Sequence, residues 1–462
     1  MKRTRYTAIS VFLGAFLLLS GCAGGTIDAD QGIKDEQILS EQEAEEGTQE
    51  QEGSEEENGR NVGEADEEVE EEVIEEEPEG FVSPYEFDYP DAVRGIYVTG
   101  HSAGGERFTR LIDLINSTDL NAMVIDIKDD HGYLTFRPEE DSELYGVSQR
   151  YIRDIKEVLE TLEVHNIYPI ARIVVFKDSV IANEKPEWSF LENNSVWKNN
   201  RQESFINPFL KEVWDYNIEF AKLAAELGFK EIQFDYVRFP EGFEKRDQQL
   251  TYSMGEYSPI PILDEDGETI GEDYVQPRVN AVTDFVAYAK QELAGYPVDV
   301  SVDIFGYAAT LPEAPGIGQN FLKISSHVDV ISSMIYPSHW TSYFGIAKPD
   351  LEPYRLVEEY AKVENSKLDE LDNPPVSRPW LQDFTASWLG KGNYVKYGVD
   401  EVEAQIKALN EAGIWEFLLW NANNNYTPDV NYLPIGPVPA DFVEQGTERR
   451  AKVDERRFSS SE

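Results

Sequence analysis

Two aspartates stand near the ends of apolar, strand-like runs, in positions where carboxylates can act as acids, bases or nucleophiles. Asp235 follows the run Glu231–Phe234, and Asp303 follows the run Val298–Val302. Since side chains alternate along a strand, each aspartate is predicted on the face opposite the apolar side chains. An unpaired charge inside a domain is costly, so inward carboxylates indicate a ligand-binding mouth rather than a core. We therefore predict Asp235 and Asp303 as catalytic residues, with Asp126 as the alternative second carboxylate.

Eight strand-like runs lie between about residues 85 and 441, and helical patterns separate them. Strands that alternate with helices favour a parallel sheet, and eight such units favour a closed barrel with its chemistry at the C-terminal ends of the strands. The predicted fold class is α/β, a (β/α)8 TIM barrel with inserted βα loops. An open doubly wound sheet is the alternative. The runs are Arg94–Thr99, Ala122–Lys128, Tyr168–Phe176, Glu231–Phe239, Val298–Gly306, Asp329–Pro337, Arg378–Phe384 and Trp415–Asn421.

Glycine and an Asn-Pro pair mark the predicted helix boundaries. Gly228 suits the left-handed conformation that closes a helix before the fourth strand. Asn207 and Pro208 form a favourable cap and first turn, so a helix is predicted to start there. A later helix should end at Gly413. The long segments 177–205 and 241–277 follow the third and fourth strands and should overhang the mouth.

The same alternation places other polar and aromatic side chains late in the strands, on the inward face. Strand parity puts Lys128 on the same side as Asp126, and it turns Arg172 inward from the next strand. The alternative interpretation is a set of structural ion pairs, for example Asp126 with Arg172. The predicted ligand-binding residues are Tyr97, Lys128, Arg172, Arg238, Tyr336, Trp380, Gln382 and Trp420.

The N-terminus has the layout of a secretory signal. Lys2, Arg3 and Arg5 precede an apolar run from Ala8 to Leu19, which is short for a membrane span. The run ends in Leu-Ser-Gly-Cys, and this pattern resembles the lipobox of bacterial lipoproteins. The resemblance implies a signal peptide over 1–21, lipidation of Cys22 and attachment to the outer face of a cell membrane. A plain signal peptide is the alternative, and a single cysteine excludes an intramolecular disulfide.

An acidic segment follows the predicted signal. Residues 35–80 contain 22 acidic residues and one basic residue, Arg60, and the whole chain has a net charge of −49. Such a stretch buries too little apolar surface to order itself, so 22–82 is predicted as a disordered linker, with a cation- or cell-wall-binding role as the alternative. The acidity argues against nucleic acid as a partner. The folded part is predicted over 83–442, with a polar tail over 443–462.

Several motifs together resemble the bacterial secreted family described as "putative glycosyl hydrolase domain", which is related in pattern to the α-amylase-like hydrolases. They cover nearly all of the predicted folded part and are long enough to be specific. The matching segments are Arg94–Tyr97, Leu120–Asp130, Ala171–Asp178, Glu231–Pro240, Asp303–Gly306, Gly316–Gln319, Met334–His339, Arg378–Phe384 and Leu419–Ala422.

The resemblance implies glycoside hydrolysis by two carboxylates, which stand about 5 Å apart in retaining enzymes and about 6.5–9.5 Å apart in inverting ones. By analogy with α-amylase-like barrels, Asp235 is the nucleophile and Asp303 the acid, although those enzymes usually carry Glu on strand five. Lys128, Arg172 and Arg238 would hold Asp235 ionised or bind anionic sugar groups. The predicted location makes a cell-wall or capsular polysaccharide the expected substrate, bound by a monomer without a cofactor.

Three other interpretations remain open. The segment Gly100–Gly104 fits the G-x-S-x-G elbow of serine esterases, which would make Ser102 a nucleophile, but only about fifteen folded residues precede its strand. The cluster Asp126–His131 could bind a hard cation, although a loop cap is expected and no metal is predicted. The third interpretation is a cell-surface barrel that binds glycan without cleaving it.

Overall fold

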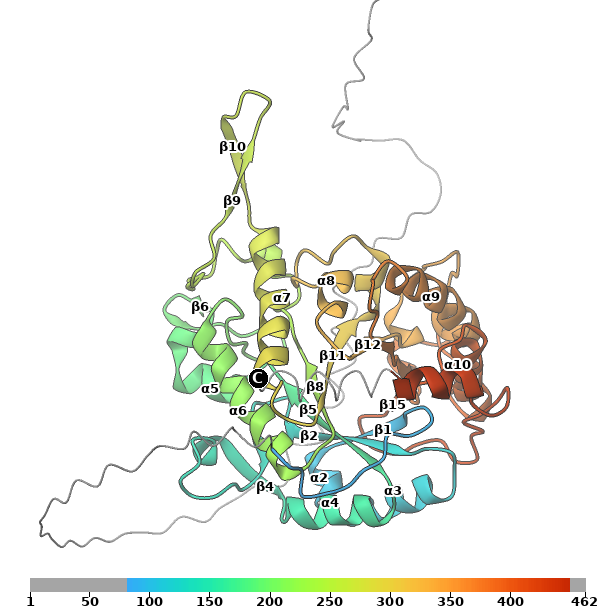
Figure 1. Ribbon diagram of the computed structural model, residues 1–462. Helices are drawn as coiled ribbons and strands as arrows, with labels where there is room; N and C mark the ends of the chain where they lie inside the picture. The colour runs from blue at the N-terminus through green and yellow to red at the C-terminus, as the bar shows by residue number, and fades with distance from the viewer. Residues whose placement is uncertain (1–80, 449–462) are drawn as a thin grey trace, which may run out of the picture.

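Eight parallel strands form a closed barrel in the computed structural model, which describes residues 81–448 (Figure 1). Each strand pairs with the next in chain order, and the last pairs with the first. The predicted TIM barrel is confirmed, and the open-sheet alternative is wrong. The strands are β1 (Arg94–Val98), β2 (Ala122–Lys128), β5 (Tyr168–Val174), β8 (Glu231–Asp235), β11 (Asp299–Phe305), β12 (Val330–Met334), β14 (Trp380–Gln382) and β15 (Phe417–Trp420).

Helices follow the strands and cover the outside of the barrel (Figure 1). Gly228 closes α6 with a φ of 108°, as predicted. The helix start predicted at Asn207 is wrong, since α6 begins at Lys211 and the Asn207 side chain instead accepts a hydrogen bond from Phe209 N and donates one to Ser253 O. The helices are α2 (Gly100–Ala103), α3 (Arg107–Asn116), α4 (Ile155–Val164), α5 (Ser179–Glu184), α6 (Lys211–Leu227), α7 (Val275–Glu292), α8 (Phe321–Ser325), α9 (Pro353–Leu368) and α10 (Val399–Glu411).

Short strands in the connecting segments were not predicted. The longest of these additions is a hairpin of β9 and β10, which projects away from the barrel beside the N-terminus of α7 (Figure 1). Its aliphatic side chains are exposed, so it contributes little to the core. The additional strands are β3 (Leu134–Phe136), β4 (Ser148–Ile152), β6 (Leu191–Glu192), β7 (Ser195–Val196), β9 (Ile260–Leu263), β10 (Thr269–Asp273) and β13 (Val376–Ser377).

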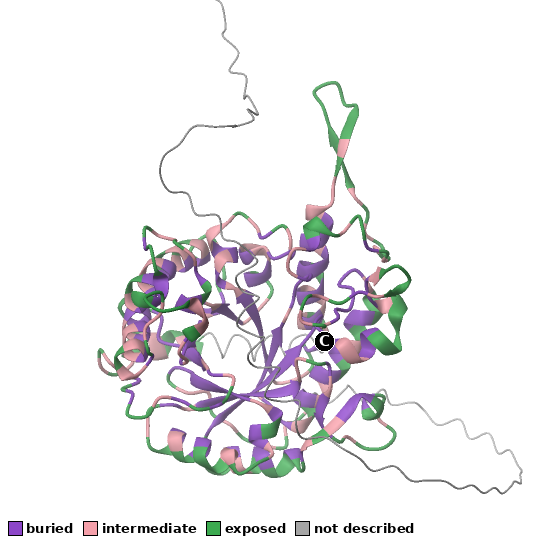
Figure 2. Cartoon of the chain, turned by 180° about the vertical axis from the view of Figure 1, so that it is seen from behind, coloured by how far each residue is buried: buried purple, intermediate pink, exposed green. Residues whose placement is uncertain are grey.

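The barrel wall separates two packed regions. Alternate residues of each strand, such as Ile232 and Phe234 of β8, pack outward against the helices in the larger core. A smaller cluster that includes Val124, Ile170 and Leu418 fills the interior. Buried residues accordingly line the strands and the inner sides of the helices, whereas exposed residues lie on the outer sides (Figure 2). This two-sided burial fixes which side chains of each strand point into the barrel.

An ion network closes the N-terminal end of the barrel. Arg378 donates to Glu231 at 2.7 Å and to Glu416 at 2.8 Å, and all three side chains are buried. Tyr89 donates to Glu416 at 2.7 Å and accepts from Arg378 at 2.9 Å. The chain enters the described part at this same end, where the Phe81 and Tyr296 rings lie 5.6 Å apart. The opposite, C-terminal end is therefore the one available for a ligand.

The predicted signal peptide, Cys22 and nearly all of the predicted linker lie outside the described residues, as does most of the polar tail. Within 81–448, no helix is long and apolar enough to cross a membrane.

Candidate active site

Asp235 and Asp303 come close together because β8 and β11 are adjacent and in register. Val302 pairs with Phe234, so each aspartate is the next residue on its strand. The residues before them pack outward against helices, which turns both carboxylates into the barrel. Neighbouring strands lie about 4.8 Å apart, which sets the scale of their separation. The side chains are nearly closed off from solvent, since Asp235 is 4% exposed and Asp303 is 1% exposed.

Arg172 of β5 holds the Asp235 carboxylate. Its Nη2 lies 2.6 Å from Asp235 Oδ2, and its Nε donates to the same oxygen at 3.0 Å. The backbone N–H of Tyr236 donates to the other oxygen at 2.6 Å. Both carboxylate oxygens of Asp235 therefore accept hydrogen bonds, one oxygen from a charged donor and the other from a neutral one.

Asp303 occupies the opposite kind of environment. Burial and the neighbouring charge of Asp235 raise the pKa of Asp303 well above its usual range. The Trp380 indole N–H donates to Asp303 Oδ1 at 2.8 Å, a contact that partly opposes the shift. Two like carboxylates at one site cannot both ionise easily, which agrees with the raised pKa of Asp303.

A third carboxylate, Asp126 of β2, shares Arg172 with Asp235. Arg172 Nη1 lies 2.7 Å from Asp126 Oδ1, and the Tyr97 hydroxyl donates to Oδ2 at 2.6 Å. Burial raises the pKa of Asp126 to about 7, against the opposing charge of Arg172. The structure therefore contains both the ion pair weighed as the alternative, Asp126 with Arg172, and a cluster of three inward carboxylates around one guanidinium.

Aromatic rings cover the carboxylates on the interior side. Tyr97 and Trp420 stack with their ring centroids 4.0 Å apart, and the Arg172 guanidinium lies 5.3 Å and 5.4 Å from these two rings. Trp380 meets Trp420 edge to face at 5.5 Å, and Tyr336 lies 6.4 Å from Trp420. Strand alternation predicted Tyr336, Trp380 and Trp420 at the mouth, and the structure brings these three rings together with Tyr97. They form an apolar surface beside the charged cluster.

Lys128 does not lie at the mouth, and its predicted inward orientation is wrong. Its ammonium contacts Asp178 at 2.8 Å and the Asn217 side chain of α6 at 2.9 Å, on the outer side of the barrel wall. The pairing of β2 with β5 shifts between Asp126 and Lys128, which is a bulge. One extra residue in a strand reverses the facing of those that follow, and simple alternation does not predict it.

Gln382 lies at the rim with its amide already bonded to the protein. Its Oε1 accepts from the Ser338 backbone and hydroxyl at 3.0 Å and 2.8 Å, and its Nε2 donates to Asp350 and Phe384 at 3.0 Å each. These bonds tie together the loops after β12 and β14. In this arrangement the Gln382 side chain positions the rim rather than presenting a free amide.

Two loops extend the charged cluster sideways. Asp130 lies 3.5 Å from both Arg172 and Lys177, and Lys177 lies 2.7 Å from Glu203. Burial opposes the charge on Asp130, yet Arg172 and Lys177 lower its pKa. Strand alternation could not predict this arrangement, because Lys177 and Glu203 belong to an inserted loop. The run of acids near Asp130 was the one available sequence signal.

The other predicted motifs have structural partners. Thr99 caps α2 by accepting from Ser102 N at 3.1 Å, and no hydrogen bond joins the Ser102 hydroxyl to a histidine within the described residues. Asp129 accepts from the backbone N–H groups of residues 131–133, as expected of a loop cap. No group of three or more acidic, histidine or cysteine side chains in the described part could hold a metal ion.

Comparison with known proteins identifies the family. The model of the family described as "putative glycosyl hydrolase domain" matches residues 95–426 of the 462, and the chain belongs to this family. Among curated proteins, no sequence matches. The match spans all eight barrel strands and both Asp235 and Asp303, so the candidate site lies within the family's domain.

Solved structures with a similar fold include several carbohydrate-active proteins. A hypothetical protein from Ruminiclostridium thermocellum is 33% identical over 45% of this chain and 96% of that one, with a TM-score of 0.37. The PgaB (BpsB) glycoside hydrolase domain from Bordetella bronchiseptica is 13% identical over 79% of this chain and 98% of that one, with a TM-score of 0.48. A β-galactosidase from Marinomonas ef1 is 12% identical over 79% and 61%, with a TM-score of 0.47.

Proposed function

We propose that the protein is a glycoside hydrolase that acts on an extracellular or cell-wall polysaccharide through Asp235 and Asp303. One observation carries this proposal: two carboxylates at adjacent strand ends occupy different environments. Arg172 forms an ion pair with Asp235, whereas burial and the Asp235 charge raise the pKa of Asp303. Pairs of titratable groups with separated pKa values supply an acid and a nucleophile from the same side-chain type. Membership in a glycosyl hydrolase family supports the same conclusion.

In the proposed mechanism, Asp303 donates its proton to the glycosidic oxygen as the bond to the anomeric carbon breaks. Trp380 occupies Asp303 Oδ1, so Oδ2 is the oxygen placed to carry that proton. Asp235 attacks the anomeric carbon, or takes a proton from the water that attacks it. Arg172 contacts both Asp235 and Asp126, and the hydrogen bond from Tyr97 to Asp126 fixes the cluster. The stacked rings would pack against the apolar face of a sugar.

The test is the release of reducing ends from a panel of wall and capsular glycans. Asp235→Asn and Asp303→Asn should each lower the rate by about a thousandfold or more, because each removes one of the two groups that the chemistry needs. Asp113→Asn, on the exposed face of α3, is the matched control and should retain full activity. Thermal unfolding of each variant checks that it is folded. Equal activity in all variants would contradict the assignment.

A second candidate function is glycan binding without cleavage. The observation that favours it is the Arg172 clamp on Asp235, together with the near-complete burial of both carboxylates. A binding barrel would retain affinity for its glycan in Asp235→Asn and release no reducing ends. The same glycan panel, measured for binding and for cleavage, therefore separates the two candidates. A serine esterase is the least supported function. If the protein is instead a glycoside hydrolase or a glycan-binding barrel, Ser102→Ala would not change any hydrolysis that the wild-type protein shows.

The proposed location is the outer face of a cell membrane, with the chain anchored through lipidated Cys22. The order of basic residues, apolar run and cysteine at the N-terminus supports this proposal. Cys22→Ser should move the protein from the membrane fraction to the soluble fraction and remove the mass of a lipid from its N-terminal peptide. An unmodified Cys22 in the wild-type protein would rule the anchor out.

A further inference from the structure

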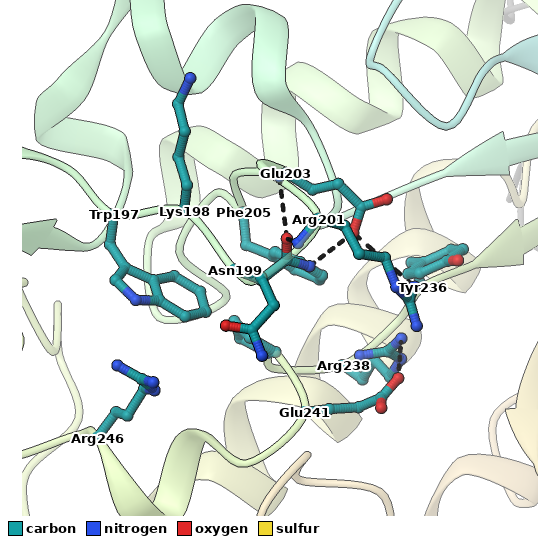
Figure 3. Close-up of a pocket in the computed structure, with 12 residues that line it drawn as sticks. Trp197, Lys198, Asn199, Arg201, Glu203, Phe205, Tyr236, Arg238, Glu241 and Arg246 are labelled. Carbon is teal, nitrogen blue, oxygen red and sulfur yellow. Dashed lines mark hydrogen bonds and ion pairs between the residues drawn. The ribbon is translucent and has the colours of Figure 1, made fainter. Parts of the chain in front are cut away.

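A cavity of about 90 Å³ opens between the loops that follow β5 and β8, beside the candidate carboxylates (Figure 3). Four of its lining residues are basic, namely Lys198, Arg201, Arg238 and Arg246, and two are acidic, namely Glu203 and Glu241. The lining therefore carries a formal charge of +2 in a chain whose net charge is −49. Such a concentration of arginines in an acidic protein indicates an anionic ligand.

Arg238 is fixed in place by the rings around it. Its guanidinium lies 4.8 Å from the Tyr236 ring centroid and 4.6 Å from that of Phe305, and the side chain is buried. It donates to Glu241 Oε1 and to Phe239 O, each at 3.2 Å. The two rings and the two hydrogen bonds fix the position of the guanidinium, whose remaining N–H groups are donors of the kind that bind a carboxylate or a phosphate.

The charge of Glu203, one of the two acids that line the cavity, is compensated by a lysine outside the lining. Glu203 lies 2.7 Å from Lys177, which is not part of the lining, and it accepts from the Asn199 amide at 2.6 Å. Arg201 lies farther from Glu203, at 4.0 Å. Because Lys177 compensates Glu203, the four basic residues of the lining outweigh its other acid, Glu241.

Trp197 and Arg246 form the outer part of the cavity. The Arg246 guanidinium lies 5.9 Å from the Trp197 ring centroid, and Figure 3 shows the two side chains beside each other. Trp197 is buried, whereas Arg246 is exposed. An aromatic ring next to an accessible cation offers both an apolar surface and a charge to a ligand that enters from solvent.

Tyr236 connects the cavity to the candidate active site. It follows Asp235 directly and adopts a positive φ of 52°, which is uncommon for a bulky residue. Its N–H donates to Asp235 Oδ1 while its ring lines the cavity. Backbone strain of this kind persists where the surroundings fix it, often at functional sites. Tyr236 lines the cavity and Asp235 is the residue before it. Their Cα atoms are therefore about 3.8 Å apart, so the cavity begins one residue from the carboxylate.

We propose that this cavity is an anion-binding subsite that holds an acidic sugar, bearing a carboxylate or a phosphate, next to the bond that is cleaved. The substrate class is then an anionic polysaccharide. The assignment to a cleaved substrate rests on the proposed function, whereas the binding of the anion does not.

Isothermal titration of the full chain with tetragalacturonate, its neutral methyl ester and inorganic phosphate tests the subsite. Tetragalacturonate should bind at least about tenfold more tightly than the ester, because only the acid offers charged acceptors to the arginines. Arg246→Gln should remove most of that difference. Lys245→Gln removes the same charge from the adjacent residue, which is outside the lining, and is the matched control. Arg238→Gln provides a second variant on the opposite wall.

The outcomes separate this inference from the proposed function. Arg246-dependent binding of tetragalacturonate supports a carboxylate subsite, and Arg246-dependent binding of phosphate alone supports a phosphate subsite. If either result is obtained and no glycan is cleaved, the anion-binding subsite is supported and the proposed glycosidase activity is rejected. Equal binding of acid and ester with no phosphate binding, or equal losses in Arg246→Gln and Lys245→Gln, overturns the subsite. Cleavage of an acidic glycan that is insensitive to Arg246→Gln keeps the glycosidase and removes the subsite.

Discussion

Replacing Asp126 by asparagine should change how the stability of the protein depends on pH. In the folded state, burial raises the pKa of Asp126 to about 7, whereas an aspartate in an unfolded chain has a pKa of about 3.9. The folded state therefore binds more protons than the unfolded state between these two values. The stability that protonated Asp126 contributes is fully present below about pH 4 and is lost as pH rises through about 7.

The size of the effect follows from the shift. Each pKa unit corresponds to about 1.36 kcal/mol, so a shift of about 3 units corresponds to about 4 kcal/mol. The amide introduced by Asp126→Asn has no proton to lose in this range, so the variant escapes this loss. The unfolding free energy of Asp126→Asn minus that of the wild type should therefore increase by up to about 4 kcal/mol between about pH 4 and pH 8. Coupling of Asp126 to Arg172 and Asp130 makes this figure a ceiling.

The assay is equilibrium unfolding in urea, followed by circular dichroism at several pH values from about 4 to 8. Only the difference between the two proteins is interpreted, because other titrating groups contribute to both. Asp113→Asn, which removes an exposed carboxylate from α3, should give a difference that does not change with pH. A flat difference for Asp126→Asn, or one that falls as pH rises, would refute the argument that burial dominates at Asp126.

Three further predictions concern other parts of the barrel. Arg378→Met leaves two buried carboxylates without their partner and should lower the unfolding free energy by about 3–5 kcal/mol, as measured in urea; a loss below about 1 kcal/mol would contradict the role given to the network. Trp380→Phe removes the N–H that favours ionised Asp303, so the alkaline limb of kcat/KM in glycan cleavage should move to higher pH, and a shift to lower pH would argue against Asp303 as the acid. Replacing residues 261–272 of the exposed hairpin by two glycines should change the unfolding free energy by no more than about 0.5 kcal/mol, and a larger loss would show that the hairpin packs on the barrel.

The barrel was predictable because eight strand-like runs alternate with helical patterns along the chain. The outward residues of β8 and β11 are apolar, and this alone turned Asp235 and Asp303 inward. The pairing of Arg172 with Asp126 was the example given for the alternative, structural interpretation, since both are polar and lie on the inward face of neighbouring strands.

Alternation failed where the backbone departs from a regular strand. The bulge before Lys128 moved that side chain to the helix side of the wall. The anion-binding cavity could not be predicted either, because it joins residues near Arg201 to residues near Arg246 across two inserted loops. Such contacts depend on how the loops fold back, which neither parity nor helical periodicity encodes. Gln382 was predicted at the correct end of its strand. Its hydrogen bonds to Ser338 and Asp350 depend on how the loops at the rim pack together, which strand alternation does not predict.

The closed end of the barrel determines where the N-terminal segment joins the domain relative to the carboxylates. Residues 81–92 lead into β1 beneath the network of Arg378 and Tyr89, so everything that precedes residue 81 is joined to the end opposite the carboxylates. If Cys22 anchors the chain, residues 22–80 give a reach of at most about 200 Å. The open end lies on the side of the barrel opposite the point where that segment joins. A long polymer could lie across the mouth without crossing the tether, and cleavage would be confined to a shell around the cell.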